Sequence, residues 1–362
     1  MKGMMRQELE KLLTEKEDLT KYRIFVWGTG NTTALYQEGF RRLEEEGFCI
    51  CGYVDSKATE GSHAFGLRVF SPEELKNEEG ALVLISTPQP KYIMQISSKL
   101  DEMGVKWRHV ESYILKGHRE EVLKVYDMLE DEKSKEIYAE LLHCRIEGRY
   151  PDEKYMDEGQ YFSFRDFVTA ETHDVVVDCG AYVGDSFEQY LWKTDGQIEK
   201  YIAFEPDPGN AQAMEYRVER LKKEWNLGDN KVALRVCAVG EKSKKSYVER
   251  YGANNGLSSK VLDVVDEKEG NDLIDCISVD DYFTERFDFL KADIESYEYQ
   301  MLLGAKNSIR KWRPKLAICI YHNSVDFYQI PLLIKEICSD YRIAVRHYSQ
   351  RLSETVLYAY IE

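Results

Sequence analysis

Short apolar runs and amphipathic stretches alternate along the first 110 residues of the chain. The run that opens "RIFVWGTGN" at residue 23 predicts a short apolar strand, and "ALVLISTP" (81–88) predicts a buried one; amphipathic stretches with helical spacing stand between them. Ser71 and Pro72 mark a helix start, with serine at the cap and proline at the first helical position. Strands that alternate with helices imply a parallel sheet with right-handed crossovers. We therefore predict a Rossmann-like three-layer α/β domain over residues 1–116.

Residues 117–160 have helical periodicity and no strand signal. Their regularly spaced valines, leucines, isoleucines and tyrosines would be exposed in a solvated spacer. We therefore predict a helical connector that packs through its apolar side.

A second alternating pattern begins at residue 161 and continues to 362. Four helices are predicted at 185–193, 208–224, 296–310 and 325–338. Only a short polar loop separates the last two predicted strands, so they should be antiparallel. This layout, a parallel sheet that ends in an antiparallel hairpin, is that of a class I methyltransferase sheet. The seven predicted strands are 174–178, 200–205, 232–239, 287–293, 315–321, 341–347 and 355–361.

Composition and charge exclude several other classes of protein. Hydrophobic residues make up 43% of the chain and charged residues 31%, and no apolar run approaches the length of a membrane span. The N-terminal helix is charged and lacks the apolar core of a signal peptide, so we expect a cytoplasmic protein. A net charge of −16 argues against nucleic acid as a partner. The eight cysteines lack zinc-ligand spacing, so no metal site is predicted from them.

The stretch "DVVVDCGAYVGDSFEQY" (174–190) predicts a strand, a glycine turn and a helix. Asp178 stands just before Gly180, where its carboxylate would repel the diphosphate of a dinucleotide and suit a ligand with an ammonium group. S-adenosylmethionine is such a ligand. Glu205 ends the next strand, where an acid commonly binds the two ribose hydroxyls. The alternative is a tight turn whose glycines serve the backbone only.

Four segments, "VDCGAYVGDSF", "AFEPDPGN", "LKADIESYE" and "LAICIYHNSVDFYQIP", occur in this order. With them, residues from about 160 to 362 resemble the FkbM-type methyltransferases, which depend on S-adenosylmethionine and are associated with O-methylation in natural-product and glycan pathways. The resemblance implies that Tyr161 covers the cofactor and that Cys237 and Ala238 edge the adenine ring. The implied cofactor site consists of Tyr161, Asp178, Gly180, Ala181, Tyr182, Gly184, Glu205, Asp207, Cys237 and Ala238.

The same resemblance implies a catalytic group at the ends of two adjacent strands. Asp293 and Glu295 match the family's D-x-E motif, and His322 matches the histidine after the fifth strand. We favour His322 or Glu295 as the base and Asp293 as an orienting group; a structural hydrogen bond is the alternative role of His322. The two carboxylates could also hold Mg²⁺ with waters, although nothing in the sequence requires it. Ser296 departs from the family pattern, which has glycine there, and this puts the identity of the acceptor in question.

The first domain carries a partial dinucleotide fingerprint in "VWGTGNTTALY". Gly28 and Gly30 are present, Ala34 stands near the last glycine position, and Asp55 ends the next strand. The domain is similar to small Rossmann-type modules beside sugar-modifying enzymes. A nucleotide or nucleotide-sugar site is one interpretation, and a domain kept for packing or dimerisation, as in a homodimer, is the other.

Taken together, these features favour an S-adenosylmethionine-dependent O-methyltransferase that acts on a saccharide, a glycan-linked or a natural-product precursor. One alternative is an inactive methyltransferase-like binding or scaffold protein in glycan assembly, which the intact acids oppose. Another is an NAD-linked sugar-modifying enzyme that uses the first domain. That enzyme would need a Tyr-x-x-x-Lys arrangement, and residues 86–117 show no convincing one.

Overall fold

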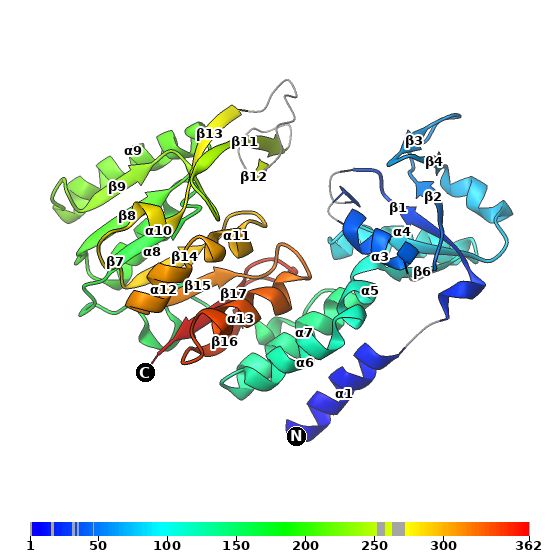
Figure 1. The fold of residues 1–362 in the computed structure, drawn as a ribbon, viewed down its shortest axis with the longest axis horizontal. Helices are drawn as coiled ribbons and strands as arrows, with labels where there is room; N and C mark the ends of the chain where they lie inside the picture. Colours follow the sequence, from blue (N-terminus) through cyan, green and yellow to red (C-terminus); the bar gives the residue numbers. More distant parts are fainter. Residues whose placement is uncertain are drawn as a thin grey trace. The chain divides into compact units, whose positions relative to one another are not determined.

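The computed structural model describes residues 2–15, 18–30, 33–34, 36–45, 47–251, 258–262 and 272–361. The chain folds into two compact units, which are described separately (Figure 1). The first unit is made of residues 1–127, 135–156 and 349–353, and the second of residues 128–134, 157–348 and 354–362.

The first unit is built around a six-stranded sheet with the order β3-β4-β2-β1-β5-β6. All neighbouring pairs are parallel except β3 with β4. The parallel strands follow the order of a doubly wound sheet, which confirms the predicted α/β class. Its elements are α1 (Lys2–Thr14), η1 (Leu19–Lys21), β1 (Arg23–Trp27), α3 (Gln37–Glu45), β2 (Ile50–Val54), β3 (His63–Ala64), β4 (Leu67–Phe70), η2 (Pro72–Asn77), β5 (Ala81–Ile85), α4 (Pro90–Glu102), β6 (Lys106–His109), α5 (Val110–Gly117), α6 (Arg119–Met128), α7 (Glu132–Glu147) and η3 (Glu153–Tyr155).

Local sequence explains the clearest elements of this unit. All five residues of β5 are buried, as expected for a central parallel strand with neighbours on both sides. The predicted helix start at Ser71 is present as a 3₁₀ helix. The Glu74 carboxylate accepts the Ser71 N–H at 2.7 Å, and Pro72 follows at the first position.

The second unit contains the remaining elements. Among the described residues of the chain, no helix combines the length and the apolar character needed to cross a membrane. The elements are η4 (Phe164–Asp166), β7 (Val175–Cys179), α8 (Asp185–Lys193), β8 (Lys200–Phe204), α9 (Pro208–Trp225), β9 (Val232–Arg235), β10 (Ala238–Val239), β11 (Lys244–Tyr251), β12 (Ser258–Leu262), β13 (Asp272–Ile277), α10 (Val279–Tyr282), β14 (Phe289–Ala292), α11 (Glu298–Leu303), α12 (Lys306–Trp312), β15 (Lys315–Cys319), α13 (Asp326–Ile337), β16 (Arg342–His347) and β17 (Thr355–Tyr360).

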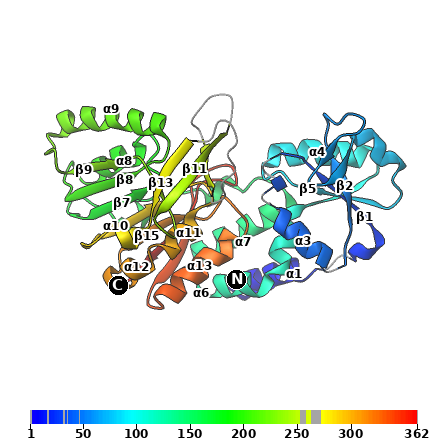
Figure 2. The same cartoon turned by 45° about the horizontal axis from the view of Figure 1, so that its top comes forward.

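Seven strands form the main sheet of this unit, in the order β16-β17-β15-β14-β7-β8-β9. The strands from β15 to β9 are parallel, and β17 is antiparallel to both of its neighbours. Helix α9 lies on one side of these strands and α12 on the other (Figure 2). This is the predicted class I methyltransferase sheet with its antiparallel hairpin.

A second, four-stranded sheet with the order β10-β13-β11-β12 was not predicted. The expected strand at 232–239 is divided, because β9 joins the main sheet and β10 pairs with β13. The sequence "YGANNGLSSK" (251–260) predicts a polar loop, either over the site or an ordinary one, yet Ser258 begins β12, which pairs with β11. Residues 252–257, Asn254 among them, lie outside the described residues. The predicted helix at 296–310 is two helices, α11 and α12.

Candidate active site

The turn between β7 and α8 is shaped by glycines in left-handed conformations. Gly180 has φ 78° and Gly184 has φ 80°. A Cβ added to Gly180 would lie 1.9 Å from the main-chain oxygen of Asp293, so only glycine allows this approach of two backbone segments. The N–H groups of Gly180 and Ala181 both donate to the Phe204 carbonyl, at 2.9 and 3.0 Å. The turn is therefore held against both neighbouring strand ends.

Asp178 is fully buried, and its charge is balanced inside the protein. It lies directly beside Lys291 in the register of β7 and β14, and the Lys291 Nζ is 2.9 Å from Asp178 Oδ1. The Tyr201 hydroxyl donates to Asp178 Oδ2 at 2.7 Å, and Lys291 also donates to the Gly180 carbonyl at 2.7 Å. Burial would lower the pKa of Lys291, but the carboxylates of Asp178 and Asp293 raise it above its ordinary value.

This pairing corrects the argument made from the sequence. The sequence predicted that Asp178 presents a free carboxylate to an ammonium group of the ligand. In the structure Lys291 supplies that ammonium group, and Asp178 is buried with Lys291 and Tyr201 as its partners. The preference for one cofactor over another must come from the groups that line the pocket.

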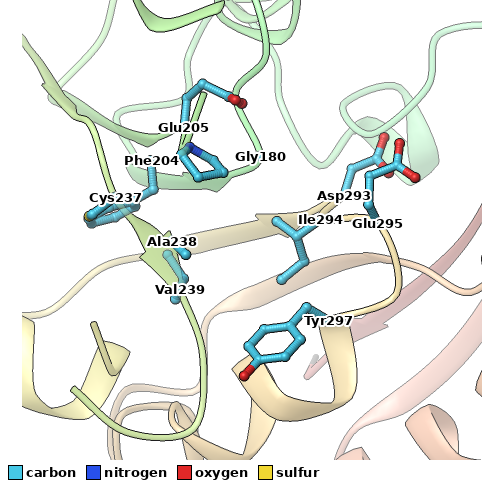
Figure 3. Close-up of a pocket in the computed structure, with 11 residues that line it drawn as sticks. Gly180, Phe204, Glu205, Cys237, Ala238, Val239, Asp293, Ile294, Glu295 and Tyr297 are labelled. Atoms are coloured by element: carbon cyan, nitrogen blue, oxygen red, sulfur yellow. The ribbon is translucent and has the colours of Figure 1, made fainter. Parts of the chain in front are cut away.

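A pocket opens beside this turn, at the carboxyl ends of β7, β8 and β14. It has an empty volume of about 420 Å³, including its open side. Figure 3 shows Glu205 on one side of it and Asp293 and Glu295 on another. It is lined by Gly180, Phe204, Glu205, Pro206, Cys237, Ala238, Val239, Asp293, Ile294, Glu295 and Tyr297.

Glu205 is the buried acid of this pocket. Its two carboxylate oxygens accept the N–H groups of Asp207 and Tyr182, each at 2.9 Å, and Asn210 donates to it at 3.3 Å. Burial raises the pKa of Glu205 to about 7, although these donors lower it in part. The carboxylate is thus fixed in direction at the end of β8, where the sequence predicted a ribose-binding acid.

The other residues predicted for the cofactor have mixed positions. Cys237 and Ala238 line the pocket, and burial raises the pKa of the Cys237 thiol to about 11. Asp207 caps α9 instead, since its Oδ1 accepts the N–H groups at positions 209 and 210. Tyr161 is buried and does not line the pocket; its hydroxyl donates to Asp293 Oδ2 at 2.8 Å. Tyr182, with φ 48°, is 38% exposed.

The three predicted catalytic residues do gather at one place. His322 Nε2 lies 3.4 Å from Asp293 Oδ1 and 3.8 Å from Glu295 Oε2. Burial would lower the pKa of His322, but the carboxylates of Glu298, Asp293 and Glu295 raise it to about 10. Such a histidine is already protonated at neutral pH, which does not suit the base that the sequence predicted.

The two carboxylates in this group differ. Burial alone would raise the pKa of Asp293, but the charges of His322 and Lys291, with the hydroxyls of Tyr161 and Tyr321, lower it below its ordinary value. Burial raises the pKa of Glu295, although the charge of His322 lowers it in part and its side chain is 43% exposed. Glu295 is therefore the better proton acceptor of the two.

The structure explains the family's glycine at the position of Ser296. Glu295 has φ 55° and Ser296 has φ 79°, so two consecutive residues are left-handed. Glycine adopts this conformation without strain, whereas a residue with a Cβ does not. The departure therefore adds local backbone strain to the loop that carries Asp293 and Glu295.

In the first unit, the residues of the partial fingerprint lie together, but Asp55 is engaged by the chain itself. Its Oδ2 accepts the Thr29 hydroxyl at 2.6 Å, and its Oδ1 accepts the Lys57 N–H at 2.8 Å. Gly28, with φ 127°, is packed closely against the side chain of Ser86. Gly30 has no neighbour near its Cβ position.

Two residues of the site were missed in the sequence. Lys291 is a charged residue within the buried strand β14, and a lysine in an apolar run could have indicated an internal partner. Glu298 is fully buried at the start of α11 and lies three residues after Glu295. It is the last residue of the segment "LKADIESYE", but the sequence predicted no role for it.

Two family models match parts of the chain. The model of the methyltransferase FkbM domain matches residues 178–343, and that of the C2185-like N-terminal domain matches residues 20–111. No curated protein matches the chain significantly.

Among solved structures, a methyltransferase FkbM from Methylobacillus flagellatus KT is 20% identical, with a TM-score of 0.58 over 99% of this chain and 97% of that chain. Aeropyrum pernix fibrillarin, in complex with S-adenosyl-L-methionine, is 11% identical, with a TM-score of 0.34 over 53% of this chain and 68% of that chain. An rRNA methylase from Streptococcus thermophilus is 14% identical, with a TM-score of 0.31 over 52% and 88% of the two chains. Residues 178–343 of this chain therefore form a methyltransferase FkbM domain.

Proposed function

We propose that the protein is an S-adenosylmethionine-dependent O-methyltransferase whose acceptor is a hydroxyl of a saccharide or of a related natural-product or glycan precursor. One observation carries the proposal. A single pocket has the buried acid Glu205 on one side and the acids Asp293 and Glu295 on another. Glu205 suits a ribose, and Asp293 and Glu295 suit a hydroxyl that must lose a proton.

The residues present fit this cofactor. Glu205 Oε2 accepts only the Tyr182 N–H and retains a lone pair that can accept a ribose hydroxyl, whereas Oε1 accepts both the Asp207 N–H and the Asn210 amide. Val239 and Ile294 give the pocket the apolar surface that an adenine ring needs. Gly180 brings bare backbone to the edge of the pocket, where a methionyl group could approach it. When bound, S-adenosylmethionine supplies a methyl group on a cationic sulfur that leaves as a neutral thioether.

The acceptor end of the pocket determines the chemistry that this chain adds. A sugar hydroxyl is a weak acid and needs a base late in the reaction. The acceptor hydroxyl loses its proton to Glu295 while its oxygen forms the new bond to the methyl carbon. Asp293, which stays ionised, orients the acceptor. The carboxylates repel an anionic acceptor, so the site favours an uncharged, hydroxyl-bearing one.

Calorimetric titration with S-adenosylmethionine, S-adenosylhomocysteine and NAD in parallel tests the cofactor. The informative variant is Glu205→Gln, because an amide cannot accept both the Tyr182 and the Asp207 N–H. Glu215→Gln, on the exposed face of α9, is the matched control. We expect both adenosyl ligands to bind the parent and the control, and to bind Glu205→Gln at least about tenfold more weakly, the loss of one hydrogen bond to a charged group.

Other outcomes would overturn the proposal. Binding of NAD without the adenosyl ligands would favour a sugar-modifying oxidoreductase, and binding of none of the three would favour a scaffold. If S-adenosylmethionine binds, incubation with sugar acceptors followed by mass spectrometry shows whether oxygen is methylated.

A further inference from the structure

Glu298 lies beside His322 and connects it to the loop that carries Asp293 and Glu295. Its side chain is fully buried, and its Oε1 accepts the Ile294 N–H at 2.8 Å. The same oxygen lies 3.1 Å from His322 Nδ1. One carboxylate therefore contacts both the histidine and the backbone between Asp293 and Glu295.

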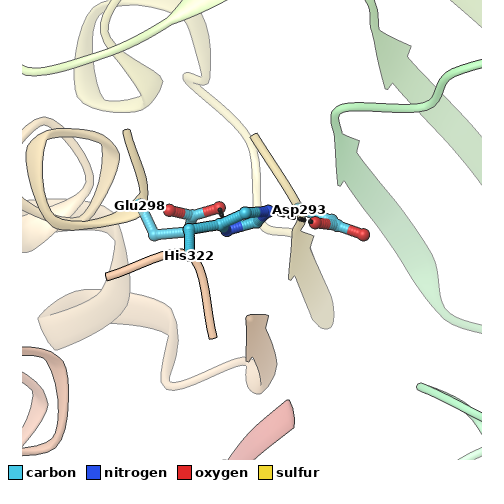
Figure 4. A group of neighbouring side chains, drawn as sticks. All are labelled: Asp293, Glu298 and His322. Atoms are coloured by element: carbon cyan, nitrogen blue, oxygen red, sulfur yellow. Dashed lines mark ion pairs between the residues drawn. The ribbon is translucent and has the colours of Figure 1, made fainter. Parts of the chain in front are cut away.

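The opposite edge of the imidazole ring also faces acids. His322 Nε2 lies 3.4 Å from Asp293 Oδ1 and 3.8 Å from Glu295 Oε2. Figure 4 shows the ring between Glu298 and Asp293. A neutral imidazole carries a proton on one nitrogen only, whereas the imidazolium donates from both. Carboxylates on both edges therefore favour the imidazolium.

A divalent cation is the competing explanation, because ligand atoms of Asp293, Glu298 and His322 lie within 4.8 Å of one another. Two observations oppose it. The two ring nitrogens face different carboxylates, so the ring itself occupies the space between them. Asp293 already accepts the Tyr161 hydroxyl at 2.8 Å and the Tyr321 hydroxyl at 3.1 Å. The positive charge between these acids is thus the charge of the histidine.

We propose that Glu298 is a positioning residue that holds His322 as an imidazolium and thereby fixes the loop of Asp293 and Glu295. His322 acts as the cationic anchor of that loop, and the acceptor proton passes to Glu295. The transfer of the acceptor proton to Glu295 rests on the proposed function; the positioning role of Glu298 does not. His322 Nδ1 faces Glu298, and its Nε2 faces Asp293 and Glu295. Its ring lies against that of Tyr321, tilted by 37°, with centroids 4.0 Å apart.

The experiment is an NMR titration of the histidine Cε1–H signals between about pH 6 and pH 10. The signal of His322 is assigned by its loss in His322→Gln. Glu298→Gln keeps the side-chain volume and an oxygen for the Ile294 N–H but removes the charge. We expect His322 of the parent to stay protonated through neutral pH and its pKa to fall by about 1 to 3 in Glu298→Gln.

Two further variants complete the titration. Glu298→Asp, which keeps the charge, should retain the protonated histidine. Glu336→Gln, on the exposed side of α13, removes the same charge elsewhere and should change nothing.

Turnover gives the second readout. In Glu298→Gln, kcat/KM should fall as pH rises through the new pKa of His322, because the anchor loses its charge there. The parent should show no such fall in that range. A structural role of Glu298 alone would lower turnover equally at every pH.

Three results would overturn the proposal. The first is a parent His322 that titrates near its ordinary pKa, and the second is a His322 titration that is unchanged in Glu298→Gln. The third is broadening of the His322 signal by added Mn²⁺ together with turnover that EDTA abolishes. If Glu298→Gln fails to fold, the titration of the parent and of Glu298→Asp decides. Failure of S-adenosylmethionine to bind would overturn the function and leave the titration intact.

Discussion

Replacing Lys291 by methionine tests the buried ion pair that supports the glycine turn. Methionine retains most of the aliphatic length of lysine and removes the ammonium group. The side chains of Lys291 and Asp178 are 3% and 0% exposed, so Asp178 would remain as a buried charge with the Tyr201 hydroxyl as its remaining donor among the contacts described above. Breaking a buried pair from one side costs about 3–5 kcal/mol.

This cost converts to a measurable shift. For a unit of roughly 200 residues, each kcal/mol lowers Tm by about 2–4 °C, so Lys291→Met should lower it by about 6–20 °C. Guanidinium unfolding gives the free energy directly. The double variant Lys291→Met with Asp178→Asn removes both charges and should cost only about 1 kcal/mol, the lost hydrogen bond to the Gly180 carbonyl. A double variant as unstable as Lys291→Met would refute the reasoning, because the penalty would then not come from the unpaired charge.

Three further predictions concern the same unit. Gly184→Ala should cost about 1–2 kcal/mol for its left-handed backbone. Gly180→Ala should cost about 1–3 kcal/mol more than Gly184→Ala, because its Cβ would collide with the main-chain oxygen of Asp293. Equal denaturant midpoints for the two variants would contradict this. Ser296→Gly should stabilise the protein by about 0.5–1 kcal/mol, measured by thermal unfolding, since glycine removes the strain of φ 79°. The pKa of Glu205 is about 7, above its ordinary value, so the native state holds the proton more tightly. Stability should therefore fall as pH rises from about 4.5 to about 7 and then level off, while affinity for S-adenosylmethionine rises over that range; a flat profile in both titrations would exclude this role.

The architecture of the second unit follows from features that a sequence displays locally. Apolar runs, glycine turns and the short link before β17 predict its strands and its antiparallel hairpin, because each depends on residues that are close in the chain. The second sheet was not predicted, since β11, "KKSYVERY", reads as a polar surface segment until its partners β12 and β13 are known.

The candidate site likewise combines residues that could be placed from local sequence with residues that depend on distant partners. Glu205, Asp293 and Glu295 could be placed from strand ends, since parallel strands end at one edge of a sheet. The partners of Asp178 could not, because Lys291 is 113 residues away in the chain and becomes its neighbour only through the register of β7 and β14. The protonation of His322 likewise depends on Glu298, whose direction is set by the turn at Ile294.

The position of β17 constrains how the second unit can form. This strand is the last of the sheet in sequence order, yet it pairs with β15 on one side and β16 on the other, and all six of its residues are buried. Until β17 has left the ribosome, β15 and β16 present unpaired edges with apolar faces, and such edges recruit other chains. The unit therefore completes its sheet only after synthesis of its final strand, and a chain shortened by these few residues should aggregate before it could be tested for activity.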